Sequence, residues 1–186
     1  MYISHENYTI KARDYDKNRQ AVETDILITK ILETSKRLNK PVEEMILGDF
    51  GCGTGNYVSI LLQKFNFKKV IGIEMNDGMI SVFKEKFENN PSVHLYKQSL
   101  FEMDLKGEKV DVAIMNQVSH HLDTQKKTLP RISADFPNLK KVISNISELI
   151  TVGGIFLVDF STALQNIKGI WYHNHIFPPK FVTVSK

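Results

Sequence analysis

Short apolar runs alternate along the chain with segments in which apolar residues recur every three or four positions. Five such runs predict strands, over Met45–Phe50, Lys69–Ile73, Val93–Tyr96, Val110–Met115 and Ile155–Phe160. The last run is apolar enough to be buried on both faces of a sheet. Strands joined by helices are typical of a parallel sheet with right-handed crossovers.

The segments between the strands predict amphipathic helices. One is expected over Gly55–Phe65, and a second is expected to begin with Asp77 as its N-cap. A third, over Leu139–Ile150, is expected to end at the Gly153–Gly154 pair. Ahead of the first strand, Arg19–Leu38 predicts a leading helix. Its expected inward positions are Val22, Ile26, Leu27, Ile31 and Leu32.

These elements predict one doubly wound α/β domain over residues 1–186, with residues 1–40 as an N-terminal helical cap. The sheet is expected to be mostly parallel, with helices on both faces. In such a sheet, ligands bind beyond the carboxyl ends of the central strands.

Composition and charge indicate which partners and which cell compartment to expect. Hydrophobic residues make up 42% of the chain, and the net charge of +3 is spread along it, so we expect no nucleic-acid partner. No apolar run approaches the roughly 20 residues of a membrane span, and no membrane partner is expected. The single cysteine, Cys52, cannot form an internal disulfide and suits a reducing compartment. The expected localisation is cytoplasmic.

The stretch LGDFGCGTGNY, at residues 47–57, places three glycines at alternate positions directly after an apolar run. A loop of this kind at a helix N-terminus lets a ligand approach the backbone closely. A dinucleotide fingerprint would need glycine at positions 51, 53 and 56, but position 56 is Asn. The loop therefore argues against a nicotinamide cofactor.

The loop and several other segments together resemble the class I S-adenosylmethionine-dependent methyltransferases of the small-molecule type. DFGCGTG (Asp49–Gly55) resembles their first motif, and VIGIE supplies the acidic residue expected at the end of the second strand, Glu74. VDVAIMNQVSHHL and ISELITVGGIFLVDFS resemble their fourth- and fifth-strand segments. YDKNR (Tyr15–Arg19) has counterparts ahead of the leading helix. The resemblance covers about residues 8–178.

The resemblance implies that the loop holds S-adenosylmethionine. The three glycines would lie under the methionyl part and the ribose, and Asp49 would orient the amino end or the loop itself. Glu74 would accept hydrogen bonds from the ribose hydroxyls. Met75 would lie against the adenine face. Ser99 stands where the family usually has an Asp that binds the adenine amino group, and its hydroxyl makes a weaker hydrogen bond.

Further contacts are implied at the fourth strand and near the N-terminus. Asn116 and Gln117 would face the methyl group and the acceptor, and Tyr15 would cover the sulfonium cation with its aromatic face. The full set of expected cofactor-binding residues is Tyr15, Arg19, Asp49, Gly51, Cys52, Gly53, Gly55, Glu74, Met75, Ser99, Asn116 and Gln117.

His120 is the candidate catalytic residue, as a proton acceptor that faces the substrate. A second interpretation stays open, in which His120 caps or packs at the start of a helix. Methyl transfer mainly requires alignment of the acceptor, and it needs a base only where the acceptor must lose a proton. Cys52 is interpreted as a small filler of the loop rather than a nucleophile. No metal-ligand spacing is present near His120, and no metal site is expected.

The predicted function is methyl transfer from S-adenosylmethionine to a small-molecule acceptor. The fourth strand carries no Asn-Pro-Pro-Tyr or Asp-Pro-Pro-Tyr string, which argues against methylation of a base or a glutamine amide. One alternative is a domain that binds the cofactor without catalysis, and a less favoured one is a nicotinamide-dependent oxidoreductase.

The chain after Phe160 is short for this class, which normally closes the sheet with two further strands. We therefore expect a truncated chain that lacks the C-terminal strand pair. An open sheet edge beside the fifth strand would then favour self-association.

Overall fold

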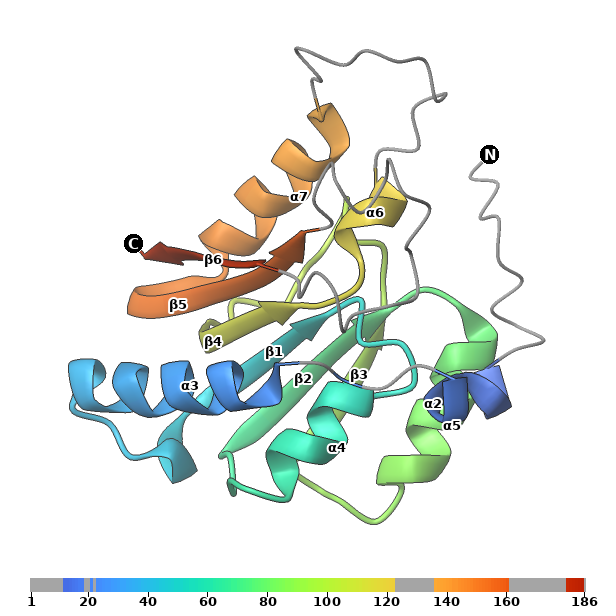
Figure 1. Cartoon of the computed structure of the whole chain (residues 1–186), viewed down its shortest axis with the longest axis horizontal. Helices are drawn as coiled ribbons and strands as arrows, with labels where there is room; N and C mark the ends of the chain where they lie inside the picture. The colour runs from blue at the N-terminus through green and yellow to red at the C-terminus, as the bar shows by residue number, and fades with distance from the viewer. Residues whose placement is uncertain (1–11, 19–20, 22, 123–135, 161–179, 186) are drawn as a thin grey trace.

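The computed structural model describes residues 12–18, 21, 23–122, 136–160 and 180–185. Six strands form one sheet in the order β3-β2-β1-β4-β5-β6 (Figure 1). The strands are β1 (Ile46–Phe50), β2 (Lys69–Glu74), β3 (Val93–Lys97), β4 (Val110–Met115), β5 (Ile150–Phe160) and β6 (Lys180–Ser185). The first five strands are parallel, and β6 runs antiparallel to β5. The predicted doubly wound, mostly parallel sheet is confirmed.

Helices cover both faces of the sheet, as predicted (Figure 1). One face is covered by α3 (Thr24–Leu38), α4 (Asn56–Leu62) and α5 (Asp77–Phe87), and the other by α6 (Ser119–Leu122) and α7 (Pro137–Glu148). Three short helices complete the described chain, η1 (Ala12–Asp14), α2 (Tyr15–Asn18) and η2 (Val42–Glu44). Within the described ranges, no helix is both long and apolar enough to cross a membrane.

The core consists of two apolar layers, one on each face of the sheet. Successive residues of a strand point to opposite faces. In β5, Ile155 and Leu157 therefore join the layer under α3 and α4, whereas Phe156 and Val158 join the layer under α7. All four are at most 2% exposed, which confirms that β5 is buried on both faces.

The leading helix differs from its prediction at its start and on its buried face. α3 begins at Thr24, after Glu23 in a left-handed conformation (φ 52°), and not at Arg19. Its buried stripe is Leu27, Ile31 and Thr34, spaced by four and three residues. Ile26 and Leu32 were expected inward but are 40% and 44% exposed. Each lies one residue, about 100° of helix rotation, away from the buried stripe. Val22 lies outside the described residues.

Two turn residues also have roles that differ from their predictions. The N-cap of α5 is Asn76, whose Oδ1 accepts a hydrogen bond from the Met79 N–H at 3.1 Å, and Asp77 is the first helical residue. Asn and Asp are equally good N-caps, so the sequence did not distinguish them. The Gly153–Gly154 pair lies inside β5 and does not end α7.

A bulge explains the position of this glycine pair. Val110 pairs with Ile150 and Val112 pairs with Ile155, so several residues of β5 lie opposite one residue of β4. Gly153 has a φ of 81°, which glycine adopts without strain. The strand therefore begins at Ile150, five residues earlier than predicted.

The edge of β5 is covered, so the expectation of an open edge beside the fifth strand is wrong. Residues Ile155–Phe160 pair with Lys180–Ser185 of β6. Among the described residues, β6 is the one strand that follows β5. Self-association stays a prediction, without an open edge at β5 to support it.

Candidate active site

The glycine loop crosses from β1 to α4 at the carboxyl edge of the sheet. Gly51, Gly53 and Gly55 all have positive φ values, of 81°, 54° and 77°. The loop is fastened to β2, because the N–H groups of Gly51 and Cys52 both donate to the Ile73 carbonyl, at 2.8 and 3.0 Å. Three left-handed glycines at alternate positions therefore shape the turn.

The three glycines face different surroundings. A Cβ on Gly51 would lie 2.6 Å from Cγ2 of Val118, and a Cβ on Gly55 would lie 2.4 Å from Cε2 of Phe87. A Cβ on Gly53 would meet no atom within 4 Å. Gly51 and Gly55 are therefore needed for packing, whereas Gly53 borders open space that a ligand can fill.

Glu74, at the end of β2, holds the tip of the loop. Its Oε2 accepts a hydrogen bond from the Gly53 N–H at 3.0 Å. Its Oε1 accepts from the N–H groups of Met75 and Asn76, both at 2.8 Å. The structure thus places the expected ribose-binding acid next to the glycine with the open side. Its contact with a ribose stays a prediction.

Asp49 is buried in β1 beneath the loop and is only 3% exposed. Burial, and secondarily the negative charge of Glu74, raises the pKa of Asp49 to about 8. The carboxyl group therefore keeps its proton at neutral pH until a cation arrives. Burial also raises the pKa of the Cys52 thiol, which fits a filler residue rather than a nucleophile.

A cavity of about 50 Å³ lies against the loop. Its lining residues are Tyr15, Gly51, Cys52, Gly53, Asn56, Tyr57, Asn116 and Gln117. The sequence predicts six of these eight residues but not Asn56 and Tyr57, which follow the last glycine. Ligand pockets usually measure roughly 300 Å³ or more, so this cavity accounts only for the part of a ligand next to the loop.

The Asn116 side chain is a buried amide at the end of β4. It is 6% exposed, and neither its Oδ1 nor its Nδ2 has a hydrogen-bond partner in the part of the chain that the structure describes. A buried polar group left in this state costs about 1–3 kcal/mol. Because the amide lines the cavity, it is a group that a bound ligand would satisfy.

Asp159, near the end of β5, was not predicted as a site residue. Its Oδ1 accepts a hydrogen bond at 2.7 Å from the N–H of Gln117, whose backbone is left-handed (φ 57°). Its backbone carbonyl accepts from the Ser119 hydroxyl at 2.9 Å. Burial raises the pKa of Asp159 to about 6, and the nearby charge of Glu23 adds to this, although the hydrogen bond from Gln117 opposes it. The signal in the sequence was an acid within the apolar run IFLVDF.

Tyr15 reaches the cavity because α2 is fastened to the loop. Asp16 accepts hydrogen bonds from the Thr54 hydroxyl and from Nζ of Lys86, both at 2.5 Å. One carboxylate thus joins α2 to the glycine loop and to α5.

The remaining predicted residues lie around this centre. Met75 is 64% exposed, and the Ser99 hydroxyl accepts a hydrogen bond from the Phe101 N–H at 3.3 Å. His120 belongs to α6, which follows the end of β4, and Arg19 lies outside the described residues. The roles of all four stay predictions. Over the described ranges, no group of three His, Cys, Asp or Glu residues is placed to hold a metal ion.

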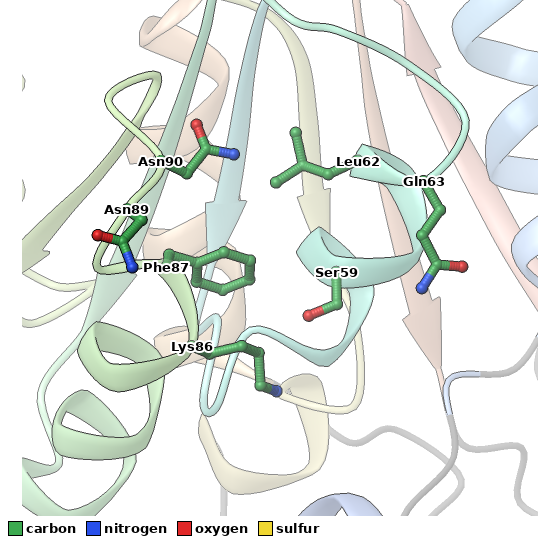
Figure 2. Close-up of a pocket in the computed structure, with 7 residues that line it drawn as sticks. All are labelled: Ser59, Leu62, Gln63, Lys86, Phe87, Asn89 and Asn90. Carbon is green, nitrogen blue, oxygen red and sulfur yellow. The ribbon is translucent and has the colours of Figure 1, made fainter.

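A larger cavity, of about 430 Å³, lies between α4 and α5 (Figure 2). Its lining residues are Ser59, Leu62, Gln63, Lys86, Phe87, Asn89 and Asn90. It shares no lining residue with the cavity at the loop, and none of the predicted site residues contributes to it.

The chain is similar to known methyltransferases in sequence. A family model described as "Methyltransferase domain" matches residues 41–176. A protein-lysine N-methyltransferase of Saccharolobus islandicus is 24% identical over 124 residues, which are 64% of this chain and 73% of that protein.

Two solved structures are similar in fold. An S-adenosylmethionine-dependent methyltransferase from Clostridium acetobutylicum matches with a TM-score of 0.63 and 21% identity, over 86% of this chain and 60% of the other. CalS10, an amino pentose methyltransferase from Micromonospora echinaspora solved with S-adenosylmethionine bound, matches with a TM-score of 0.55 and 17% identity, over 87% and 58%. The chain thus spans less than two thirds of the length of either structure.

Proposed function

The chain belongs to the methyltransferase domain family, and from this premise we propose that it transfers a methyl group from S-adenosylmethionine to a small-molecule acceptor. One observation carries the proposal. The open side of Gly53, the carboxylate of Glu74 and the unsatisfied amide of Asn116 gather at the carboxyl edge of β1, β2 and β4. The strand order reverses between β1 and β4, and ligands of doubly wound sheets bind at such a point.

The residues present fit this cofactor. Oε2 of Glu74 accepts one hydrogen bond from the protein and has a further lone pair for a ribose hydroxyl. Asp49 would ionise beside a cationic ligand and stabilise its charge. When bound, S-adenosylmethionine supplies the methyl group on a positively charged sulfur, which is already an excellent leaving group. The protein then has to align the acceptor and exclude water.

The small-molecule class of acceptor is supported by the similar fold of the amino pentose methyltransferase. The archaeal relative is named as a protein-lysine N-methyltransferase, so a protein acceptor is the alternative to separate by experiment. We also propose a cytoplasmic location, which is supported by the single, buried thiol of Cys52.

The first test is thermal unfolding with S-adenosylmethionine, S-adenosylhomocysteine and NADH in parallel. A ligand at a hundred times its dissociation constant stabilises a protein by about 2.7 kcal/mol. We expect stabilisation by the first two and none by NADH. Stabilisation by NADH alone would contradict the proposal.

The second test measures transfer of a labelled methyl group to two fractions of a cell extract, the small-molecule filtrate and the retained protein. Label in the filtrate supports the proposal, and label in the protein fraction alone identifies a protein acceptor. Binding of the cofactor without transfer to either fraction would indicate a non-catalytic domain.

A further inference from the structure

The carboxyl edge of the sheet gathers acidic side chains without basic partners. Asp49, Glu74 and Asp159 lie at or near the ends of β1, β2 and β5, and Glu23 precedes α3 close enough to raise the pKa of Asp159. In the part of the chain that the structure describes, none of these four forms an ion pair with Lys, Arg or His. Asp16, in contrast, is paired with Lys86.

Two of these acids lie on the cofactor side of the site, and two lie on the opposite side. Asp49 and Glu74 belong to β1 and β2, next to the glycine loop. Asp159 belongs to β5, on the other side of β4. Val158 pairs with Met115, so the next residues, Asp159 and Asn116, lie beside each other at the end of the two strands. The acceptor must approach the methyl group from the side that the cofactor does not occupy, which is the side of β4 and β5.

The Asp159 carboxylate is held in place and still has capacity for a ligand. Its Oδ1 accepts from the Gln117 N–H, and the N–H of Asp159 itself adds a second backbone hydrogen bond to the carboxylate. A carboxylate offers about four acceptor positions, so capacity remains. The groups that act on the carboxylate are Glu23 from before α3, the Gln117 N–H after β4 and the N–H of Asp159 itself. The Ser119 hydroxyl of α6 donates to the backbone carbonyl of the same residue. None of these groups supplies a positive charge.

We infer that the methyl acceptor is a protonated amine and that Asp159 is its counter-ion. This inference rests on the proposed function and names the acceptor class. The neighbouring Asn116 amide, buried and without partners, offers Oδ1 as a second acceptor for an amine N–H. An anionic acceptor would instead meet two uncompensated carboxylates, Asp159 and Glu23.

A protonated amine must lose one proton before its nitrogen can take a methyl group. The N–H bond breaks, its electron pair stays on nitrogen, and the proton passes to Oδ2 of Asp159. A pKa near 6 suits this transfer, because a proton acceptor works best when its pKa lies near the working pH.

The charge of the product tests the acceptor class. The protein is incubated with methyl-tritiated S-adenosylmethionine and the small-molecule filtrate of a cell extract. Labelled products are eluted from a cation exchanger at pH 7 with a salt gradient, and unreacted S-adenosylmethionine, itself a cation, is located in a control without protein. We expect the labelled product to be retained. A labelled product that flows through overturns this inference and leaves the proposed function intact, whereas failure of S-adenosylmethionine to stabilise the protein overturns the proposed function itself.

Substitution of Asp159 by Asn tests the counter-ion. Asn keeps an oxygen for the Gln117 N–H and removes the charge, so the backbone at the end of β4 is preserved. The substrate is the unmethylated form of the labelled product that the cation exchanger retains. For this substrate, Asp159→Asn should raise KM at least tenfold and leave the affinity for S-adenosylmethionine within twofold. The control is Glu43→Gln, which removes the same charge from an exposed residue of η2, before β1, and should leave KM unchanged.

An unchanged KM in folded Asp159→Asn would overturn the role of Asp159. If circular dichroism shows that this variant does not fold, Glu23→Gln replaces it. Glu23 is only partly buried, and removal of its charge should raise KM by a smaller factor, about twofold to fivefold. An unchanged KM in this second variant would likewise contradict an acidic acceptor site.

Discussion

Asp49 should make the cofactor-free protein less stable as the pH rises, and Asp49→Asn should remove this effect. Burial beneath the glycine loop raises the pKa of this carboxyl from its ordinary value of 3.8 to about 8. Between these values, the folded protein keeps a proton that the unfolded chain has lost. The stabilising contribution is therefore complete below about pH 4 and is lost as the pH rises to about 8.

The size of the effect follows from the same two pKa values. At about 1.4 kcal/mol per pKa unit, ionised Asp49 costs the folded protein at most about 6 kcal/mol. Asparagine has nearly the same shape and no proton to lose. Because total stability is typically 5–15 kcal/mol, even half of this amount would be easy to measure.

Urea unfolding of wild type and Asp49→Asn at pH 5, 7 and 9, without cofactor, measures the difference. The stability of the variant relative to wild type should increase by several kcal/mol from pH 5 to pH 9. Glu74→Ala should reduce the wild-type loss, because the Glu74 charge is the second cause of the raised pKa. Saturating S-adenosylmethionine should also reduce it, because a bound cation favours the ionised form. A stability difference that is constant with pH would refute the reasoning.

Three further predictions concern the groups around the cavity. Glu74→Ala should weaken binding of S-adenosylmethionine by about 1.5–3 kcal/mol in calorimetry, because a charged hydrogen-bond acceptor is lost. Unchanged affinity in a folded variant would exclude the ribose contact. Gly53→Ala should impair cofactor binding and lose only the roughly 1–2 kcal/mol that a left-handed alanine costs, since its Cβ meets no atom. Gly55→Ala should lower the melting temperature further, because its Cβ also meets Phe87 and Phe83. Equal effects of the two variants on binding would contradict this distinction. Asn116→Leu should leave the cofactor-free protein as stable or about 1–3 kcal/mol more stable in urea, since it removes two buried polar atoms without partners. A loss of stability of that size would show that the amide is satisfied in the folded protein.

The sequence predicted the sheet well because each strand is a short apolar run with a clear boundary. Val110–Met115 was predicted with its observed bounds, and the glycine loop was placed at the correct edge. The bulge in β5 could not be predicted, since a glycine pair after an amphipathic helix is equally typical of a helix end. Nor could the pairing of β6 with β5, which depends on contacts between distant segments.

The residues of the candidate site likewise fall into a group that the sequence predicted and a group that it did not. Residues in the glycine motif and at strand ends, such as Glu74 and Asn116, were found because their positions follow from the order of elements. Asp159 was missed although FLVDF carries the same signal as ILGDF, an acid within a buried strand. Recognising it required the neighbouring strand, because the hydrogen bond from the Gln117 N–H holds the carboxylate in place. Tyr57 was missed because its helical spacing also fits a core position, and it is 7% exposed.

The bulge in β5 also determines which insertions and deletions the domain can tolerate. Between the pairs Val110–Ile150 and Val112–Ile155, β5 has four residues and β4 has one. The difference is three, an odd number. Loss or gain of a single residue there would reverse the alternation of every later position in the strand, if the bulge keeps its shape, because each later residue would then move by one position in the register with β4. Asp159 would then exchange its orientation with Val158, and the acceptor side would lose its carboxylate without any substitution. Over evolutionary time, length changes at residues 151–154 should therefore occur in steps of two. Gly153, with its φ of 81°, and Gly154, whose Cβ would lie 2.8 Å from the Asp111 carbonyl oxygen, should stay glycine.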